Sequence, residues 1–254
     1  MTAFEHALTA TYCKNPCQVL PNALWKTVAV IDKYKTAYST EHGVVTFLKM
    51  WNDEQFLLYW TKNRVFTVSK EYLEKVTFMV IHQDYLKYVP RDAFSSQKSY
   101  FRLIHRGDIP AVRLPSGYCI TDVAINDEVE DISRLIAQCY TNLHPSVETV
   151  QSWTTHPVFD KRLWIWVTQG NTPVGLGIAE RDPVVPEGSL EWIQVLPAYR
   201  GIGIGRYIVV ELLRRLQETV SFTTVSGEGD NYTKQFYESC GFYGEDIWWI
   251  LQKE

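Results

Sequence analysis

Three glycines alternate with isoleucines directly before a long amphipathic segment, as Gly201-Ile202-Gly203-Ile204-Gly205. Glycine lets the backbone come close to a bulky anion. The first turn of a helix offers N–H groups that lack partners within the helix and carry a partial positive charge. The chemistry that this arrangement favours is the binding of a pyrophosphate.

Two common nucleotide-binding motifs do not fit this stretch. A P-loop ends in Gly-Lys-Ser/Thr, whereas Gly205 is followed by Arg206 and Tyr207. A Rossmann site needs Gly-x-Gly-x-x-Gly directly after a buried strand near the start of a βαβ unit, and the glycine spacing here differs from that pattern.

The pattern Arg-x-x-Gly-x-Gly, formed by Arg200, Gly203 and Gly205, resembles a motif of the GNAT superfamily, the acyl-CoA-dependent N-acyltransferases. Further along the chain, residues 231–242 resemble the closing helix signature of the same family, with Asn first and Tyr-Glu-x-x-Gly-Phe near the end. The resemblance covers about residues 117–254 and implies acetyl-CoA as co-substrate.

The resemblance also implies which residues hold the co-substrate. Backbone amides on the strand before the glycine turn would bond the pantetheine arm, amides of the turn would hold the pyrophosphate, and an Asn on the closing helix would touch the CoA arm. The implied cofactor-binding residues are Ile193, Val195, Arg200, Gly201, Ile202, Gly203, Ile204, Gly205, Arg206 and Asn231.

Two residues are candidates for proton transfer. The resemblance places Tyr237 near the thioester sulfur, where its phenol would act as general acid, although a core position beside Phe236 also explains it. Glu191 is the candidate base, because it shares strand parity with Ile193 and Val195. Glu180 and Glu228 are its reserves.

The resemblance implies an N-acetyltransferase that moves an acetyl group from acetyl-CoA to a primary amine of a small molecule or peptide. The alternative is a non-catalytic CoA-binding sensor or structural module, which would keep Gly203 and Gly205 but could dispense with Tyr237. Peptide N-termini, polyamines, amino acids and amino-bearing antibiotics all remain open as acceptors.

Hydrophobic periodicity predicts the strands and helices that position these residues. The expected strands are Tyr118–Ile125, Leu163–Thr168, Val174–Glu180, Ser189–Val195, Phe222–Val225 and Asp246–Leu251. The expected helices are Asp127–Tyr140, Ser146–Trp153, Gly203–Thr219 and Asn231–Ser239. This order predicts an α+β fold with a mixed sheet, which the resemblance specifies as GNAT-like, mostly antiparallel and flanked by helices.

The first 115 residues indicate an additional α/β region without a recognisable fold. Thr27–Ile31, Val76–His82 and Tyr100–His105 have the composition of strands, whereas Val44, Phe47, Leu48 and Trp51 have helical spacing. No internal repeat is evident. Pro and Gly punctuation at 110–117 suggests a boundary between residues 1–115, an acceptor-side or interface domain, and residues 116–254, the acetyltransferase domain.

Charge and composition limit the class of partner. Residues 1–115 carry a net charge of +5 and residues 116–254 carry −9, so an acidic catalytic half suits a cationic acceptor. Neither half has the Lys/Arg density of a nucleic-acid-binding protein. The five cysteines and six histidines show no metal-ligand spacing, so no metal is expected. The chain has no secretory signal or membrane-length apolar run, which favours a cytoplasmic protein.

Overall fold

The computed structural model describes residues 1–253, which form two compact units. The first unit contains residues 1–104, 224–235 and the chain from Tyr243 onward. The second contains residues 105–223 and 236–242. The last strand of the chain is therefore grouped with the N-terminal residues, whereas the sequence suggested one boundary near residue 115.

The first unit combines helices with a mostly antiparallel sheet. Its helices are α1 (Ala3–Lys14), α2 (Pro16–Val19), α3 (Leu24–Val28) and α4 (Lys70–Lys75), with 3-10 turns η1 (Ile31–Lys33), η2 (Gln83–Tyr88) and η3 (Arg91–Ala93). Its strands are β1 (Lys35–Glu41), β2 (Val44–Trp51), β3 (Gln55–Thr61), β4 (Phe78–His82), β5 (Ser96–His105) and β11 (Tyr243–Gln252).

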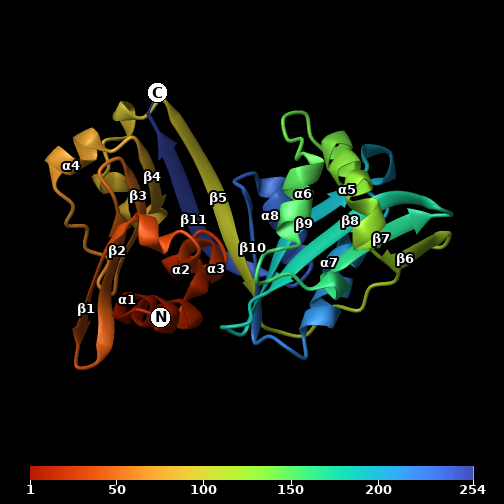
Figure 1. Ribbon diagram of the computed structural model, residues 1–254, viewed down its shortest axis with the longest axis horizontal. Coiled ribbons are helices and arrows are strands. Elements are labelled where there is room, and N and C mark those ends of the chain that lie inside the picture. Colours follow the sequence, from red (N-terminus) through yellow and green to blue (C-terminus); the bar gives the residue numbers. More distant parts are fainter. Residues whose placement is uncertain (254) are drawn as a thin grey trace. The chain divides into compact units, whose positions relative to one another are not determined.

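The strand order in this unit is β1-β2-β3-β4-β11-β5. All neighbours are antiparallel except β3 and β4, which are parallel. In Figure 1 the blue strand β11 lies between β4 and β5, although it comes from the other end of the chain. The first unit therefore depends on the last strand of the sequence.

Two N-terminal predictions are wrong. Val44–Trp51 is strand β2 rather than a helix, because the turn before it, with His42 at φ 51° and Gly43 at φ 76°, closes a hairpin. Thr27–Ile31 is helical rather than extended, since it spans the end of α3 and the start of η1. The predicted strands at 76–82 and 100–105 are confirmed as β4 and β5.

The second unit confirms the element order expected from the sequence. Its strands are β6 (Tyr118–Asp122), β7 (Trp164–Gln169), β8 (Thr172–Arg181) and β9 (Glu187–Val195), in the order β9-β8-β7-β6. Its helical elements are α5 (Ile125–Cys139), α6 (Val147–Trp153), η4 (Lys161–Leu163), η5 (Pro197–Tyr199) and α7 (Ile204–Leu216). Strand β10 (Phe222–Glu228) and helix α8 (Asn231–Ser239) cross the division between the units. The predicted α+β fold with a mostly antiparallel mixed sheet is confirmed.

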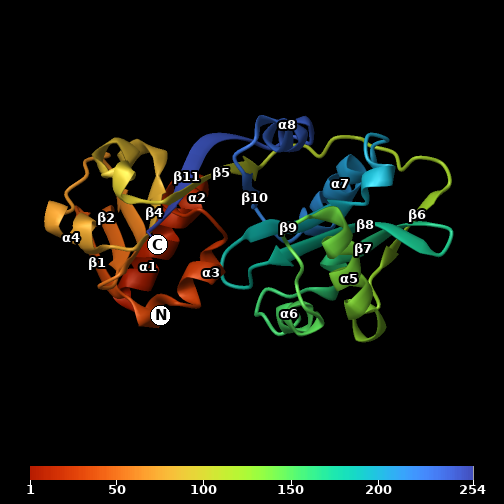
Figure 2. The same ribbon diagram turned by 90° about the horizontal axis from the view of Figure 1, so that it is seen from above.

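Helix α7 lies close against the second unit's sheet. Figure 2 shows α7 on one face of β7–β9 and helices α5 and α6 on the other. Gly177 of β8 makes this approach possible, because a Cβ there would lie 2.5 Å from Ile208 of the helix. Ile204, Ile208, Leu212 and Leu216 recur every four residues on α7 and are all buried. This packing fixes the start of α7 relative to the strands.

No helix in the described part of the chain is both long enough and apolar enough to cross a membrane.

Candidate donor-binding and catalytic site

The glycine turn before α7 has a backbone conformation that side chains rarely adopt. Gly201 has φ 81° and Gly203, the residue that caps α7, has φ 96°. A Cβ built at either glycine would meet nothing within 4 Å. The space over both residues is therefore open to a ligand.

The turn and the start of α7 present a row of backbone N–H donors. Among the described residues, the N–H groups of residues 201–206 have no hydrogen-bond acceptor, and the N–H of Tyr207 is the first to bond, to the carbonyl of Gly203 at 3.0 Å. The start of α7 adds its partial positive charge to these donors. Such a row can bind the oxygens of a pyrophosphate.

The strand before the turn presents further amides. The N–H of Leu196 donates to the carbonyl of Val174 at 2.9 Å, next to the pair Gly175–Val195. In an antiparallel ladder this makes Gly175–Val195 a non-hydrogen-bonded pair, so the N–H and C=O of Val195 point away from β8. Ile193, two residues earlier, has the same orientation. Both residues expected to bond the pantetheine arm thus direct their amides away from β8.

Arg200 supports the turn through its side chain. Its Nε donates to the carbonyl of Val195 at 2.9 Å, and its Nη2 donates to the carbonyl of Cys139 at 3.3 Å. Cys139 is the last residue of α5, where carbonyl groups carry partial negative charge. The guanidinium therefore ties the end of β9 to the end of α5. Its expected contact with the cofactor stays a prediction.

Tyr237 is the buried residue of α8, with 9% of its surface exposed. Burial is the main cause that raises the pKa of its phenol. Negative charge on Tyr140, Cys240 or Glu191 also raises the pKa, so these groups lie near enough to interact with it electrostatically. Its ring also meets that of Phe236 edge-on, at 5.0 Å between centroids. Tyr237 therefore combines a core position with polar neighbours.

Glu191 lies at a β-bulge. The register pairs Ile178 with Trp192 and Ala179 with Leu190, so Glu191 is passed over on β9. A bulge re-aims side chains, so strand parity with Ile193 does not by itself fix the direction of Glu191. The contacts of its carboxylate define that direction instead.

Those contacts join the candidate base to one of its reserves. The Ser189 hydroxyl lies 3.0 Å from Oε1 of Glu191 and 3.3 Å from Oε2 of Glu180. The two carboxylates thus share one hydroxyl on one face of the β8–β9 pair. Charge on Glu191 is also the smallest of the causes that raise the pKa of Tyr237.

The other two predicted residues, Asn231 and Glu228, lie in the first unit, at the ends of elements that cross the division between the units. Asn231 is the first residue of α8, and Glu228 is the last of β10. The start of α8 is capped by Asp230, whose Oδ1 accepts the N–H of Thr233 at 2.6 Å. The expected contact of Asn231 with the CoA arm, and the reserve role of Glu228, stay predictions.

Gln194 and Tyr140 are two residues of the second unit that the sequence did not single out. Gln194 Nε2 donates to the Tyr140 hydroxyl at 2.8 Å, and only 6% of Gln194 is exposed. A glutamine that alternates with Ile193 and Val195 on a buried strand needs a hydrogen-bond partner, and that signal could have identified it. No sequence pattern pointed to Tyr140.

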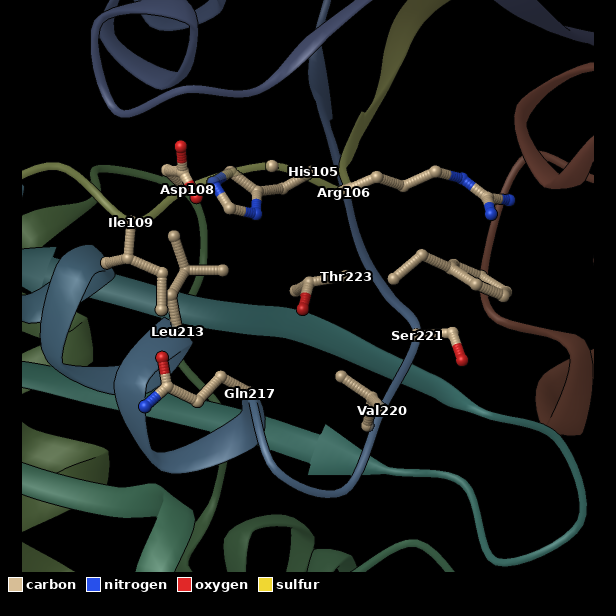
Figure 3. Close-up of a pocket in the computed structure, with 11 residues that line it drawn as sticks. His105, Arg106, Asp108, Ile109, Leu213, Gln217, Val220, Ser221 and Thr223 are labelled. Atoms are coloured by element: carbon tan, nitrogen blue, oxygen red, sulfur yellow. The ribbon is translucent and has the colours of Figure 1, made fainter.

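A separate cavity of about 240 Å³ lies at the opposite end of α7 (Figure 3). Leu213 and Gln217 line it together with His105, Asp108 and Thr223. A helix of this length spans roughly 20 Å from the glycine turn to that end. The cavity is therefore not the pyrophosphate position. Within residues 1–253, no group of three or more His, Cys, Asp or Glu side chains is placed to hold a metal.

Comparison with solved structures shows the same fold over nearly the whole chain. A GCN5-related N-acetyltransferase from Sphaerobacter thermophilus matches with a TM-score of 0.71 and 12% identity, covering 98% of this chain and 91% of its own. A GNAT-family acetyltransferase from Colwellia psychrerythraea matches at 0.65 and 11% identity, over 100% and 98%. A tandem GNAT protein from the clavulanic acid biosynthesis pathway matches at 0.56 and 14% identity, over 97% and 93%.

A search of curated proteins found no match. Residues 129–242 match the model of the acetyltransferase (GNAT) family, and this range includes the glycine turn, β9 and α8. Residues 129–242 therefore belong to an acetyltransferase domain of the GNAT family.

Proposed function

We propose that this enzyme transfers an acetyl group from acetyl-CoA to a primary amine of a small molecule or peptide. The observation that carries the proposal is the row of N–H groups at residues 201–206, which lack acceptors among the described residues, together with the open space over Gly201 and Gly203. A pyrophosphate held there would place the rest of the co-substrate along the outward amides of Val195 and Ile193.

The chemistry needs two proton transfers and one stabilised oxyanion. A lysine-like amine, with a pKa of about 10.4, must lose a proton before its nitrogen attacks the thioester carbonyl. The carbonyl oxygen then becomes an oxyanion, which backbone N–H groups of β9 can stabilise. The C–S bond breaks as the amide forms, and the leaving thiolate takes a proton.

We assign these proton transfers to two residues of the second unit. Glu191 receives the amine proton, directly or through a water, with its carboxylate held by the Ser189 hydroxyl. Tyr237 donates a proton to the thiolate, because its raised pKa keeps the phenol protonated throughout the neutral range. Acetyl-CoA turnover with detection of the free thiol, scanned over a panel of amines, tests this function. Absence of thiol release above hydrolysis with every amine class would contradict it.

A Gly203→Val variant should weaken CoA binding at least tenfold, which is about 1.4 kcal/mol. The branched side chain would fill the open space over the turn and strain a residue at φ 96°. Gly117→Val is the matched control, because Gly117 has φ 86° and equally open surroundings before β6. Calorimetry should show weakened binding for Gly203→Val alone. Equal affinities in the two folded variants would remove the pyrophosphate assignment.

A Glu191→Gln variant should lose the acidic limb of the pH profile of kcat/KM, because the amide cannot take up the amine proton. Glu180→Gln provides the comparison, since Glu180 contacts the same hydroxyl of Ser189. We expect the larger loss in Glu191→Gln. If only Glu180→Gln alters the profile, the base is Glu180.

A further inference from the structure

The first hairpins of the two units have the same register and the same irregularity. In β1–β2 the register shifts between the pairs Ser39–Phe47 and Thr40–Val45. In β7–β8 it shifts between Val167–Gly175 and Thr168–Pro173. Each residue of β7–β8 lies 128 positions after the corresponding residue of β1–β2: Val167 corresponds to Ser39, and Gly175 corresponds to Phe47. A bulge is a local feature, so its recurrence at the same pair indicates a structural repeat.

The next strand repeats as well. The register of β2–β3 passes over Leu57, as that of β8–β9 passes over Glu191. The N–H of Lys62 donates to the carbonyl of Thr46 at 3.0 Å, and the N–H of Leu196 donates to that of Val174 at 2.9 Å. The two acceptors, Thr46 and Val174, lie on the second strand of each hairpin and are again 128 positions apart. On the third strand, Leu57 corresponds to Glu191 and Thr61 to Val195.

In each unit a helix follows the third strand and precedes a fourth strand that lies beside the third: α4 precedes β4 beside β3, and α7 precedes β10 beside β9. The N–H groups of Thr77 and Phe78 both donate to the carbonyl of Glu54, at 2.8 and 3.2 Å. In the second unit the N–H groups of Ser221 and Phe222 both donate to the carbonyl of Pro186, at 2.8 and 3.3 Å. Both units therefore run through three antiparallel strands, a helix and a further strand, with α4 in the position of α7.

In the first unit the donor position is occupied by the protein's own side chains. Thr61, the counterpart of Val195, donates its N–H to the Tyr85 hydroxyl at 3.0 Å. Only 2% of Tyr85 is exposed, and its ring meets Tyr59 at 5.1 Å and Phe66 at 5.9 Å. The ladder between β3 and β4 has only the pairs Gln55–Phe78 and Phe56–Met79, so this aromatic cluster lies where the two strands have stopped pairing.

The turn before α4 also differs from the glycine turn. Side chains of the same loop and of β3 cap its amides: Asn63 Oδ1 accepts from Val65, and the Tyr59 hydroxyl accepts from Thr67 at 2.8 Å. The N-cap hydroxyl of Ser69 accepts from the first turn of α4. The loop 62–69 contains no glycine. Donors that the second unit leaves open are thus satisfied internally in the first.

We propose that the first unit is a second copy of the acetyltransferase core whose donor site is closed by Tyr85, so that the chain binds one CoA, at the Gly201–Gly205 turn. The proposal rests on the proposed function for the position of that single site. Leu57 in place of Glu191 leaves the first unit without the counterpart of the candidate base. The first unit is therefore not a second catalytic centre.

Titration of the full chain with CoA by calorimetry tests the number of sites. We expect one site in the parent, and no residual site of parental affinity in Gly203→Val. Two sites in the parent, or one unweakened site in Gly203→Val, would contradict the proposal that the donor site of the first unit is closed. Absence of any binding in the parent would overturn the proposed function and would still agree with a first unit that takes no CoA.

Hydrogen exchange of the full chain tests the closure itself. A Tyr85→Phe variant keeps the ring but removes the acceptor of the Thr61 N–H, so exchange at Thr61 should accelerate at least tenfold. Tyr88→Phe is the control, because Tyr88 belongs to the same turn η2 and is 46% exposed. CoA should leave exchange over residues 57–69 of the parent unchanged. Equal exchange of Thr61 in both variants, or protection of 57–69 by CoA, would contradict the proposal.

Discussion

A Tyr237→Phe enzyme should turn over about 100-fold more slowly than the parent in kcat, with its affinity for CoA nearly unchanged. The substitution removes the proton that the leaving thiolate needs and keeps the ring in its buried position. Because burial raises the pKa of this phenol, the proton remains available above neutrality, and Tyr237 should cause no loss of kcat as the pH rises from 7 to about 9.

Tyr232→Phe is the matched control for this loss, since Tyr232 belongs to the same helix and is 84% exposed. Its kcat should equal that of the parent. A folded Tyr237→Phe enzyme with parental kcat would assign protonation of the thiolate to solvent and leave Tyr237 with a packing role only.

A fragment of residues 112–254 should fail to fold as a soluble protein. It retains β11 but loses β4 and β5, the strands that pair with β11 on its two sides. Trp248 and Leu251 of β11 have no exposed surface in the intact chain, and the Trp248 Nε1 donates to the carbonyl of Cys17 at 2.7 Å. An apolar strand with two open edges is a site of aggregation.

Soluble yield and thermal unfolding by circular dichroism check this expectation. A fragment of residues 112–242, which lacks β11, provides the comparison and should aggregate less than 112–254. A soluble 112–254 fragment that unfolds cooperatively at the temperature of the full chain would show that β11 does not require the N-terminal strands.

The sequence predicted the second unit well because its signals are local. The four apolar residues of α7 recur at helical spacing, Ser146 caps α6, and Gly241 at φ 96° follows α8. The glycine turn was found for the same reason, since its chemistry depends on backbone freedom at Gly201 and Gly203. Features set by a few neighbouring residues can be inferred from those residues.

The first unit was not predicted because its organisation depends on residues far apart in the sequence. Its sheet includes β11, and its resemblance to the second unit lies in bulge positions and backbone hydrogen bonds, while the side chains differ. Val44, Phe47 and Leu48 fit a helical period, yet strand pairing with β1 and β3 determines their structure. The bulge at Glu191 and the bond from Gln194 to Tyr140 likewise depend on tertiary pairing.

The most direct test of the central claim is the response of the glycine amides to CoA. The chain has 14 glycines, so selective ¹⁵N-glycine labelling gives a small set of NMR signals that Gly→Ala variants can assign. Saturating CoA should shift the signals of Gly201, Gly203 and Gly205, whereas pantetheine, which lacks the pyrophosphate, should leave Gly201 and Gly203 in place. Unchanged signals of all three glycines at saturating CoA would contradict a CoA site at the Gly201–Gly205 turn.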